Sequence, residues 1–320
     1  DKARIYRDLE RKYRRESAKQ KRRRLLRKYL PYAVLLLAAA ALAVFLILRR
    51  GSRRLPPPDA DHLSIYVLDV GQGDAILLRA QGHAALIDAG EYDQGIRIAR
   101  QLKALGIQRL DYCINTHPHA DHIGGLQTVL REIPAGTVIL PEIPDAMLPD
   151  TPSFLHALDA ARERGVPVRT AVGREKLPLG NAEIELLCTD NAQSENLNDC
   201  SLACAVRYGE FAFLAAGDLE EPGEQAMIQA GLVPKVTVLK ISHHGSNSST
   251  SEAFLSAAAP ASAVISVGAG NDYGHPAESI LRRLRDFGCV IYRTDLDGTV
   301  LFETDGSTYS VRTHYRTDGG

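Results

Sequence analysis

The residues best suited to chemistry stand in the segment THPHADHIGG, residues 116–125. Three histidines and one aspartate lie close together in it: His117, His119, Asp121 and His122. Imidazole nitrogen and carboxylate oxygen are protein ligands of Zn²⁺, Mn²⁺ and Fe²⁺. His117 and His119 alternate and can face one side, whereas Asp121 and His122 follow about one turn later and can serve a second ion. The spacing therefore predicts a two-metal site.

An apolar strand must position this cluster, because LDYCINT, residues 110–116, runs directly into it. Around it, short runs rich in Val, Ile and Leu predict strands, and longer amphipathic stretches predict helices. In the first half we expect strands in LSIYVLDV, AILLRA, AALIDAG and TVILP and near Val168 and Ile184. Helices are expected over residues 94–105, after the histidine cluster, and over residues 154–164.

The second half of the sequence has the same texture. The paired strands LACAVRYG and FAFLAAG lead to a helix over residues 221–230 and to the apolar strand VTVLKIS. A helix over 252–258, a strand over 263–268 and a helix over 277–287 follow, and three β-rich segments close the chain. Strand groups in each half with helices between them predict an α/β fold, in which two sheets pack together and helices lie outside.

Charge is distributed unevenly along the 320 residues, although the formal net charge is only −1. Residues 1–28 hold 14 Lys and Arg against four Asp and Glu, and four more arginines lie between residues 49 and 54, so residues 55–320 carry −15. Residues 30–48 contain no charge and are long enough to cross an apolar bilayer core of about 30 Å. We therefore predict a basic segment 1–29, a transmembrane anchor 30–48, a linker 49–61 and a globular domain 62–320.

The heavier basic segment precedes the apolar run, which favours a cytoplasmic position for residues 1–29 by the positive-inside rule. The predicted location is thus the cell membrane, with a single span and an extracellular domain. Contact with anionic lipid explains the basic segment. A buried core helix is the alternative for residues 30–48, but the run is apolar on every face, which is typical of a membrane span.

The HxHxDH pattern of residues 117–122 resembles that of the metallo-β-lactamase superfamily, and the resemblance covers nearly all of residues 62–300. Seven segments occur in the order found in the extracellular metallo-β-lactamase domain of ComEC-type DNA-uptake proteins: LDVGQGDAILL, IDAG, THPHADHIGGL, AAGD, LKISHHGS, NDYGHP and YRTDLDG. The resemblance implies an αββα sandwich that holds two divalent metal ions, Zn or Mn. With its one anchor, the chain resembles a stand-alone relative of these proteins.

Carried over to this sequence, the resemblance implies further ligands. Asp218, after FLAAG, resembles the carboxylate that bridges the two metals; the alternative is a capping role for the helix that begins near Glu220. His243 or His244, after VTVLKIS, resembles the last metal-binding histidine. Neighbouring strand residues point to opposite faces, so we expect one of the two to ligate and favour His243. His244 would then contact substrate or support a ligand.

The resemblance also places Asp69, Asp74 and Asp88 near the site. Asp88 would orient a ligating histidine, or else only stabilise its own turn. His275, in NDYGHP, would bind phosphate or donate a proton, unless it caps the helix expected after Pro276. Ser246, in the serine-rich loop after the two histidines, would contact phosphate.

One departure concerns the metals. Many superfamily members carry another histidine between the first cluster and the bridging aspartate, but SENLNDCS, residues 194–201, has none. Asn198, Ser201, Cys200 or water would fill that position. The choice between Zn and Mn stays open for this reason.

These features predict a hydrolase that cleaves phosphodiesters. Two divalent ions activate a water for such a reaction, with Asp218 or Asp121 taking its proton. The resemblance implies DNA as the substrate and the DNA-uptake machinery as a partner. A phosphodiesterase for phosphocholine or cell-wall teichoic acid is one alternative, since a domain at −15 gains no general attraction to a polyanion. A non-catalytic anchored module that binds partners is the other.

Overall fold

The structure, a computed structural model, describes residues 61–189 and 194–314, together with helical positions 19, 25, 28–30, 32 and 36. The chain divides into two units, Asp1–Arg54 and Leu55–Gly320. The predicted basic segment 1–29, anchor 30–48 and linker 49–61 lie almost entirely outside the described residues. Within those residues, no helix combines the length and apolar character that a membrane span requires.

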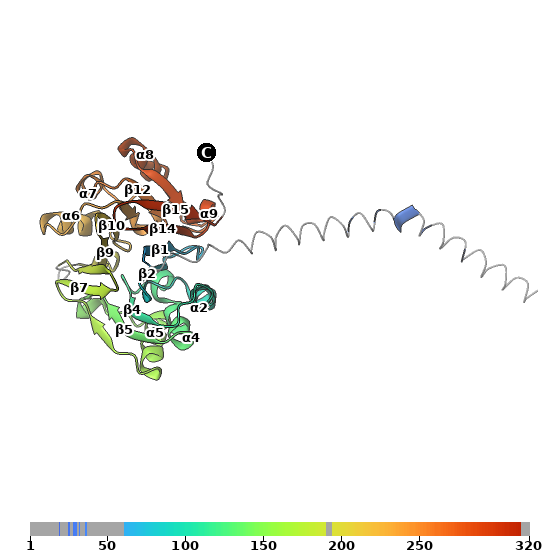
Figure 1. The fold of residues 1–320 in the computed structure, drawn as a ribbon, viewed down its shortest axis with the longest axis horizontal. Helices are drawn as coiled ribbons and strands as arrows, with labels where there is room; N and C mark the ends of the chain where they lie inside the picture. The colour runs from blue at the N-terminus through green and yellow to red at the C-terminus, as the bar shows by residue number, and fades with distance from the viewer. Residues whose placement is uncertain are drawn as a thin grey trace, which may run out of the picture. The chain divides into compact units, whose positions relative to one another are not determined.

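Two sheets form the centre of the second unit (Figure 1). The first has the order β15-β14-β1-β2-β3-β4-β5-β6. Its strands, in chain order, are β1 Leu63–Val67, β2 Ile76–Ala80, β3 His83–Ile87, β4 Leu110–Ile114, β5 Ala135–Leu140, β6 Val168–Thr170, β14 Val300–Thr304 and β15 Tyr309–Thr313.

The second sheet has the order β13-β12-β11-β10-β9-β8-β7. Its strands are β7 Arg174–Leu179, β8 Ala182–Leu187, β9 Ala203–Tyr208, β10 Phe211–Ala215, β11 Val238–Lys240, β12 Ser262–Ile265 and β13 Val290–Arg293. β11 is shorter than the predicted strand VTVLKIS, which matters for the residues that follow it.

The α-helices are α2 Gly95–Ala104, α3 Ala120–Ile123, α4 Leu126–Glu132, α5 Pro152–Glu163, α6 Glu221–Gln229, α7 Glu252–Ala258, α8 Glu278–Phe287 and α9 Thr294–Asp297. Single 3₁₀ turns are η1 Tyr92–Gln94, η2 Asp145–Met147, η3 Asn198–Cys200 and η4 Ser242–Gly245. Local sequence explains several of these bounds. Ser251 accepts a hydrogen bond from the backbone N of Phe254 and so caps α7, and α8 ends at Gly288 in a left-handed conformation.

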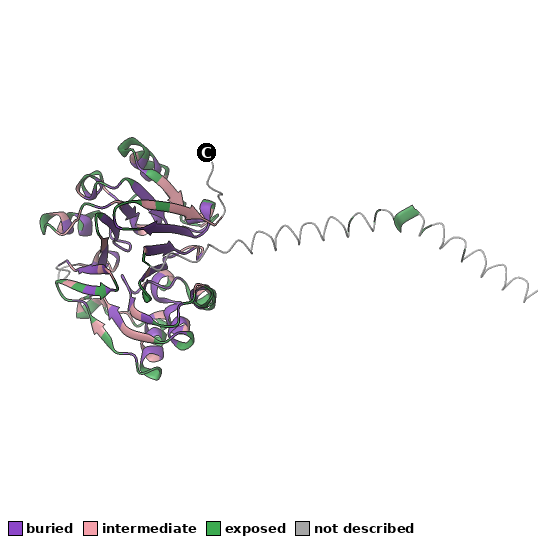
Figure 2. Ribbon diagram, in the orientation of Figure 1, coloured by how far each residue is buried: buried purple, intermediate pink, exposed green. Residues whose placement is uncertain are grey.

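The core has three parts, which define the layers. One apolar cluster joins residues of both sheets, such as Ile65, Phe213 and Phe302, and therefore lies between them. A second cluster joins the first sheet to residues of α2, α4 and α5, and a third joins the second sheet to residues of α6, α7 and α8. Buried strands with exposed helix surfaces are visible in Figure 2. The predicted pair of sheets with outer helices is confirmed.

Strand direction brings several loops to one edge. β3, β4 and β5 run parallel, as do β10, β11, β12 and β13. The carboxyl ends of neighbouring parallel strands lie at the same edge of a sheet, where ligands of such folds commonly bind. All residues singled out in the His117–His122 segment follow β4, and Asp218 follows β10.

Phe213 provides a test of the contact between the sheets, because its side chain is fully buried in the cluster between them. We expect Phe213→Ala to lower the free energy of unfolding by about 3–5 kcal/mol, through lost burial and an unfilled cavity. Urea denaturation followed by circular dichroism measures this change. Phe287→Ala is the matched control, since Phe287 is 40% exposed at the end of α8. Equal losses in the two variants would contradict this description of the core.

Candidate metal centre

A compact group of potential metal ligands consists of Asp121, His122, Asp218 and His244, with one donor atom from each lying within 4.8 Å of the others; a second group, Asp74, Asp88 and His122, shares His122 with it. His122 Nε2 lies 3.2 Å from Asp218 Oδ1 and 3.8 Å from Asp121 Oδ2. His244 Nε2 lies 3.1 Å from Asp121 Oδ2 and 3.4 Å from Asp218 Oδ2. The two oxygens of Asp218 thus face different histidines, an arrangement in which one carboxylate can bridge two ions.

His117 and His119 border this group. His117 is fully buried, and its ring lies 4.2 Å from that of His122 between centroids. Its Nε2 atom lies 4.0 Å from Asp218 Oδ2 and 2.9 Å from Nδ1 of His119. The structure therefore brings together the four residues predicted from the HxHxDH pattern, and it places Asp218 against them.

The structure favours His244 over His243 as the histidine that faces this group, contrary to the preference drawn from the sequence. β11 ends at Lys240, and both histidines lie in η4 with positive φ angles of 50° and 52°. The alternation of a strand therefore does not apply to them. His244 is buried and its Nδ1 atom bonds the carbonyl oxygen of Ser266 at 2.9 Å, which aims Nε2 at the carboxylates.

His243 lies beside the group and not within it. Its Nε2 atom is 3.9 Å from Asp218 Oδ2, and its Nδ1 atom is 3.3 Å from Glu220 Oε1. Ser248 Oγ lies 3.4 Å from the same Nδ1 atom. His243 is therefore positioned to contact a molecule that approaches the buried ligands.

Asp218 does not cap α6, so that alternative is wrong. The residue at the N-cap of α6 is Glu220, and its side chain makes no capping hydrogen bond. Asp218 is instead buried, with its backbone N donating to Ser201 Oγ at 3.2 Å. Ser201 thus holds the backbone of Asp218 in place.

Asp88 holds the histidine cluster from behind. Its Oδ2 atom lies 2.8 Å from His122 Nδ1 and accepts a hydrogen bond from Thr116 Oγ1 at 2.6 Å. Its Oδ1 atom accepts from the backbone N of Thr116 and from Asn115 Nδ2 at 2.8 and 2.9 Å. Asp88 itself has a φ of 56°. These contacts fix the orientation of the His122 ring so that Nε2 faces Asp218, as expected for a carboxylate behind a metal-binding histidine.

Asp74 introduces a partner that the sequence did not predict, the fully buried Lys240. Lys240 Nζ forms an ion pair with Asp74 Oδ2, lies 3.9 Å from Asp218 Oδ1 and donates to the carbonyl oxygen of Gly217. Asp74 also lies 3.6 Å from His244 Nδ1 and 3.9 Å from His122 Nδ1. A single lysine inside the apolar run VTVLKIS was the available signal for this buried pair.

The remaining predicted residues lie around the group. Asp69 pairs with Arg97 of α2 at 3.4 Å and bonds the backbone of Gly71, so it stabilises its own loop. Ser246 Oγ bonds Ser248 within the turn that follows η4. Asn198 Nδ2 donates to Glu220 Oε1 at 2.8 Å. Glu220 is not among the residues singled out from the sequence. Among the described residues, none of these belongs to the tight ligand group.

The histidines and carboxylates of the group stabilise one another's charged forms. Burial lowers the pKa of His122, but Asp218, Asp121 and Asp88 outweigh it and hold that pKa well above its usual value. Burial likewise lowers the pKa of His244, and Asp218 with Asp121 raises it to about 9. Conversely, His122 and His244 outweigh burial and hold the pKa of Asp218 well below its usual range. Metal binding at such a site must release protons from the histidines.

Two buried atoms support the fit of a metal directly. Asp218 Oδ1 and His122 Nε2 are both buried and lie 3.2 Å apart, but neither atom makes a hydrogen bond of good geometry in the described part of the chain. A buried polar atom without a partner is costly, and a metal ion would satisfy both. Imidazole and carboxylate donors suit Zn²⁺ and Mn²⁺ alike. The residues present therefore fit a divalent metal centre.

His275 lies beside His243, with ring centroids 5.6 Å apart. It does not cap α8, whose N-cap is Ala277, so the capping alternative is wrong. Of the arginines that follow in α8, Arg285 pairs with Glu278, Arg283 donates to the carbonyl oxygens of Ser249 and Thr250, and Arg282 is exposed.

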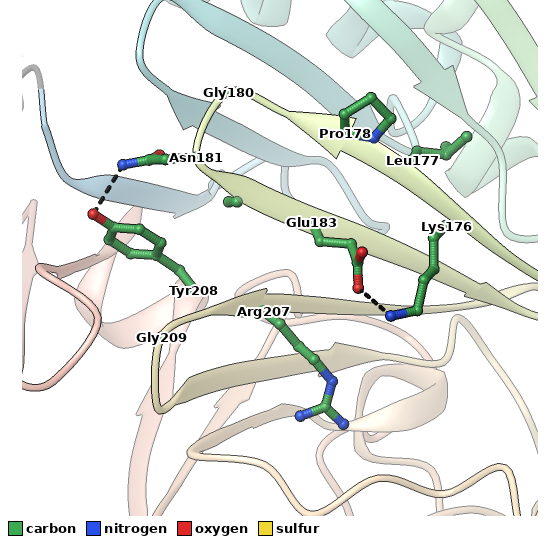
Figure 3. Close-up of a pocket in the computed structure, with 10 residues that line it drawn as sticks. Lys176, Leu177, Pro178, Gly180, Asn181, Glu183, Arg207, Tyr208 and Gly209 are labelled. Carbon is green, nitrogen blue, oxygen red and sulfur yellow. Dashed lines mark hydrogen bonds and ion pairs between the residues drawn. The ribbon is translucent and has the colours of Figure 1, made fainter.

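A separate surface pocket lies at the turns of the β7–β8 and β9–β10 hairpins (Figure 3). Its charged groups are paired: Lys176 with Glu183 at 2.8 Å, and Arg207 with Glu185 at 4.0 Å. Asn181 donates to the hydroxyl of Tyr208 at its rim. The pocket lies near the start of β10, whereas Asp218 follows the end of that strand. This pocket therefore belongs to the opposite end of the sheet from the metal centre.

Comparisons with known proteins agree with this geometry. The family model described as the metallo-beta-lactamase superfamily matches residues 68–269. The chain is 30% identical over 271 residues to ComE operon protein 3 of Bacillus subtilis (strain 168), covering 78% of this chain and 34% of that protein. It is 32% identical over 243 residues to competence protein ComA of Neisseria gonorrhoeae, covering 75% and 32%. The chain thus spans about a third of the length of these curated relatives.

A solved structure supports the fold alone. CmlA, a diiron beta-hydroxylase from Streptomyces venezuelae, superimposes with a TM-score of 0.51 at 17% identity. The match covers 76% of this chain and 54% of CmlA.

Asp88→Asn tests the support behind His122. Asparagine tolerates the left-handed backbone of residue 88, but it removes the negative charge at His122 Nδ1. We expect metal affinity to fall about 10- to 100-fold, measured by competition with a chromogenic chelator. Asp111→Asn is the matched control, because Asp111 contacts the exposed His83. A similar loss in both variants would refute a specific role for Asp88.

The metal content of two variants distinguishes the roles of His243 and His244. We expect purified His244→Ala to retain less metal after dialysis than His243→Ala, because His244 contacts both carboxylates of the group and His243 lies outside it. The measurement is metal per protein by mass spectrometry of the dialysed samples. The reverse order would restore the assignment drawn from the sequence.

Proposed function

This chain belongs to the metallo-β-lactamase superfamily and is related to the ComEC-type competence proteins, and from this premise we propose that it is a metal-dependent phosphodiesterase that cleaves DNA. The observation that carries the proposal is the buried group in which Asp218 lies between His122 and His244. A buried carboxylate placed between imidazoles at converging strand ends suits a pair of divalent ions, Zn or Mn. A metal ion bound between His122 Nε2 and Asp218 Oδ1 would satisfy both of these buried atoms.

Residues of both sheets would hold the metals. His117, His119 and Asp218 would bind one ion, and Asp121, His122, Asp218 and His244 supply the ligands around the other. A bound pair of divalent ions supplies Lewis acidity and lowers the pKa of a water molecule toward neutrality. Within residues 194–201, Ser201 Oγ accepts from the backbone N of Asp218 and Asn198 Nδ2 donates to Glu220, whereas Asn198 Oδ1 is buried without a hydrogen-bond partner among the described residues.

Asp218 and Asp121 differ in solvent exposure, and this difference suits them to different roles. Asp218 has a side chain only 4% exposed, whereas that of Asp121 is 26% exposed. Asp218 is therefore suited to a fixed ligand. Asp121 reaches solvent and is the better placed of the two to pass a proton to bulk water. His243 and His275 lie toward solvent from the group, where they can contact the phosphate of a bound substrate.

The proposal includes the place of action. Residues 30–48 would anchor the chain in the cell membrane with residues 1–29 on the cytoplasmic side, and the hydrolase unit would act outside, together with DNA-uptake machinery. The apolar run between two basic segments supports this arrangement.

Charge bears on the substrate. Residues 55–320 carry −15, so general attraction to the DNA backbone is missing. A small phosphodiester, such as phosphocholine or a teichoic acid unit, would not need that attraction. This second candidate function is therefore an explicit outcome of the test.

The test is hydrolysis by the purified chain loaded with Mn²⁺ or Zn²⁺. We expect cleavage of both single-stranded DNA and bis-p-nitrophenyl phosphate, since the same metal centre attacks either phosphodiester. His119→Ala is the control, and we expect it to lower kcat/KM at least about 100-fold on both, in line with the loss of a group that supports the reacting centre.

Each outcome has a distinct meaning. Cleavage of the small ester alone would replace DNA by a small or cell-wall phosphodiester. Hydrolysis of neither substrate by metal-loaded protein would refute the phosphodiesterase proposal and favour a binding module.

A further inference from the structure

An exposed aromatic ring lies next to the metal centre, in the loop that follows β12. Tyr273 is 71% exposed, and its ring stacks on His275 with centroids 5.7 Å apart and an interplanar angle of 25°. His275 meets the ring of His243 edge-on, and His243 Nε2 lies 3.9 Å from Asp218. Three rings thus form a continuous row from the buried carboxylate out to solvent.

The loop holds Tyr273 in a defined place. Asn271 Oδ1 accepts hydrogen bonds from the backbone N of Tyr273 and of His275 at 3.1 and 3.0 Å. Asn271 Nδ2 donates to the carbonyl oxygens of Gly268 and His275 at 3.0 and 2.7 Å. Gly268 in turn donates to Gln72 Oε1 at 3.1 Å, which ties the loop to the segment before Asp74. One side chain therefore closes the loop upon itself.

Exposure alone says little, because single exposed apolar side chains are common. The position of this ring is more informative. Its outer face is open to solvent, its inner face rests on His275, and the row leads to the proposed reaction centre. An aromatic ring beside a phosphodiester site offers a stacking surface to a nucleobase, and every base has such a π-face.

The negative charge of the unit gives an uncharged contact particular value for binding a nucleic acid. With −15 on residues 55–320, the unit as a whole offers no general long-range attraction to a polyanion. Stacking involves no net charge and contributes about 1–3 kcal/mol per base. It would also select single strands, because the bases of a duplex already stack on one another.

We propose that Tyr273 is a stacking platform for a nucleobase of single-stranded nucleic acid, with His275 and His243 between the platform and the metal centre. The inference rests on the proposed phosphodiesterase function and deepens it by naming the part of the substrate that is recognised. Tyr273 holds the base, and the adjoining phosphodiester lies along His275 and His243 toward Asp218.

Measurements of oligonucleotide binding test the role of Tyr273 independently of hydrolysis. In the full-length chain carrying His119→Ala, we would measure by fluorescence anisotropy the Kd of a labelled oligothymidylate and of a strand of equal length with abasic sites. Addition of Tyr273→Ala should raise the Kd for oligothymidylate about 10-fold and leave that for the abasic strand unchanged. Tyr273→Phe, which keeps the ring, should restore the affinity. Phe287→Ala removes an exposed ring at the far end of α8 and serves as the matched control.

The outcomes separate this inference from the proposed function. An equal loss on both strands would assign Tyr273 to loop integrity, and no loss on either, or no binding at all, would also overturn the platform. If the metal-loaded wild-type chain hydrolyses DNA while Tyr273→Ala binds normally, the function stands and the platform falls. If the wild-type chain binds through Tyr273 but hydrolyses neither test substrate, the platform stands and the phosphodiesterase proposal falls.

Discussion

Asp218 is a buried carboxylate just beyond the end of β10, and a buried charge is costly unless opposite charge and hydrogen bonds surround it. The protein meets this constraint with His122 and His244 on either side and with Lys240 beneath. Each of these groups needs a partner of its own, which Asp88, Ser266 and Asp74 provide. The ion pairs and hydrogen bonds around the site are therefore arranged to stabilise this one buried charge.

Backbone contacts keep the network compact. The loop before Asp74 lies directly against the segment of the histidine cluster, with Asp74 N donating to the carbonyl oxygen of Asp121 at 3.1 Å. Gly73, at φ 123°, has no room for a side chain, because a Cβ there would lie 2.3 Å from that carbonyl oxygen. The Gly-Gln-Gly segment is thus needed for close approach, and through Gln72 it also supports the loop that carries Tyr273.

Sequence reasoning succeeded where chemistry is local. The HxHxDH spacing identified four side chains that the structure brings close together, and alternating strand and helix patterns predicted two sheets with outer helices. Its preference for His243 over His244 is not favoured by the structure, because the strand ends two residues before the end of VTVLKIS and both histidines take left-handed conformations that alternation does not cover. It missed Lys240, since the partners that stabilise a buried lysine come from distant segments. The row of rings at Tyr273 depends on the hydrogen bonds of Asn271, which no periodicity reveals. The membrane anchor remains a prediction.

Sheet order has a consequence for how the molecule is made. β1, the first strand of the hydrolase unit, pairs with β14, so Leu63 faces Thr304 across the sheet. During synthesis on the ribosome, one side of β1 therefore stays unpaired until almost the whole unit has emerged. Exposed strand edges invite pairing with other chains, and long-range pairings form slowly. A nascent chain of this protein must keep that edge protected until its last strands arrive, and a chain terminated early would carry a permanently open edge.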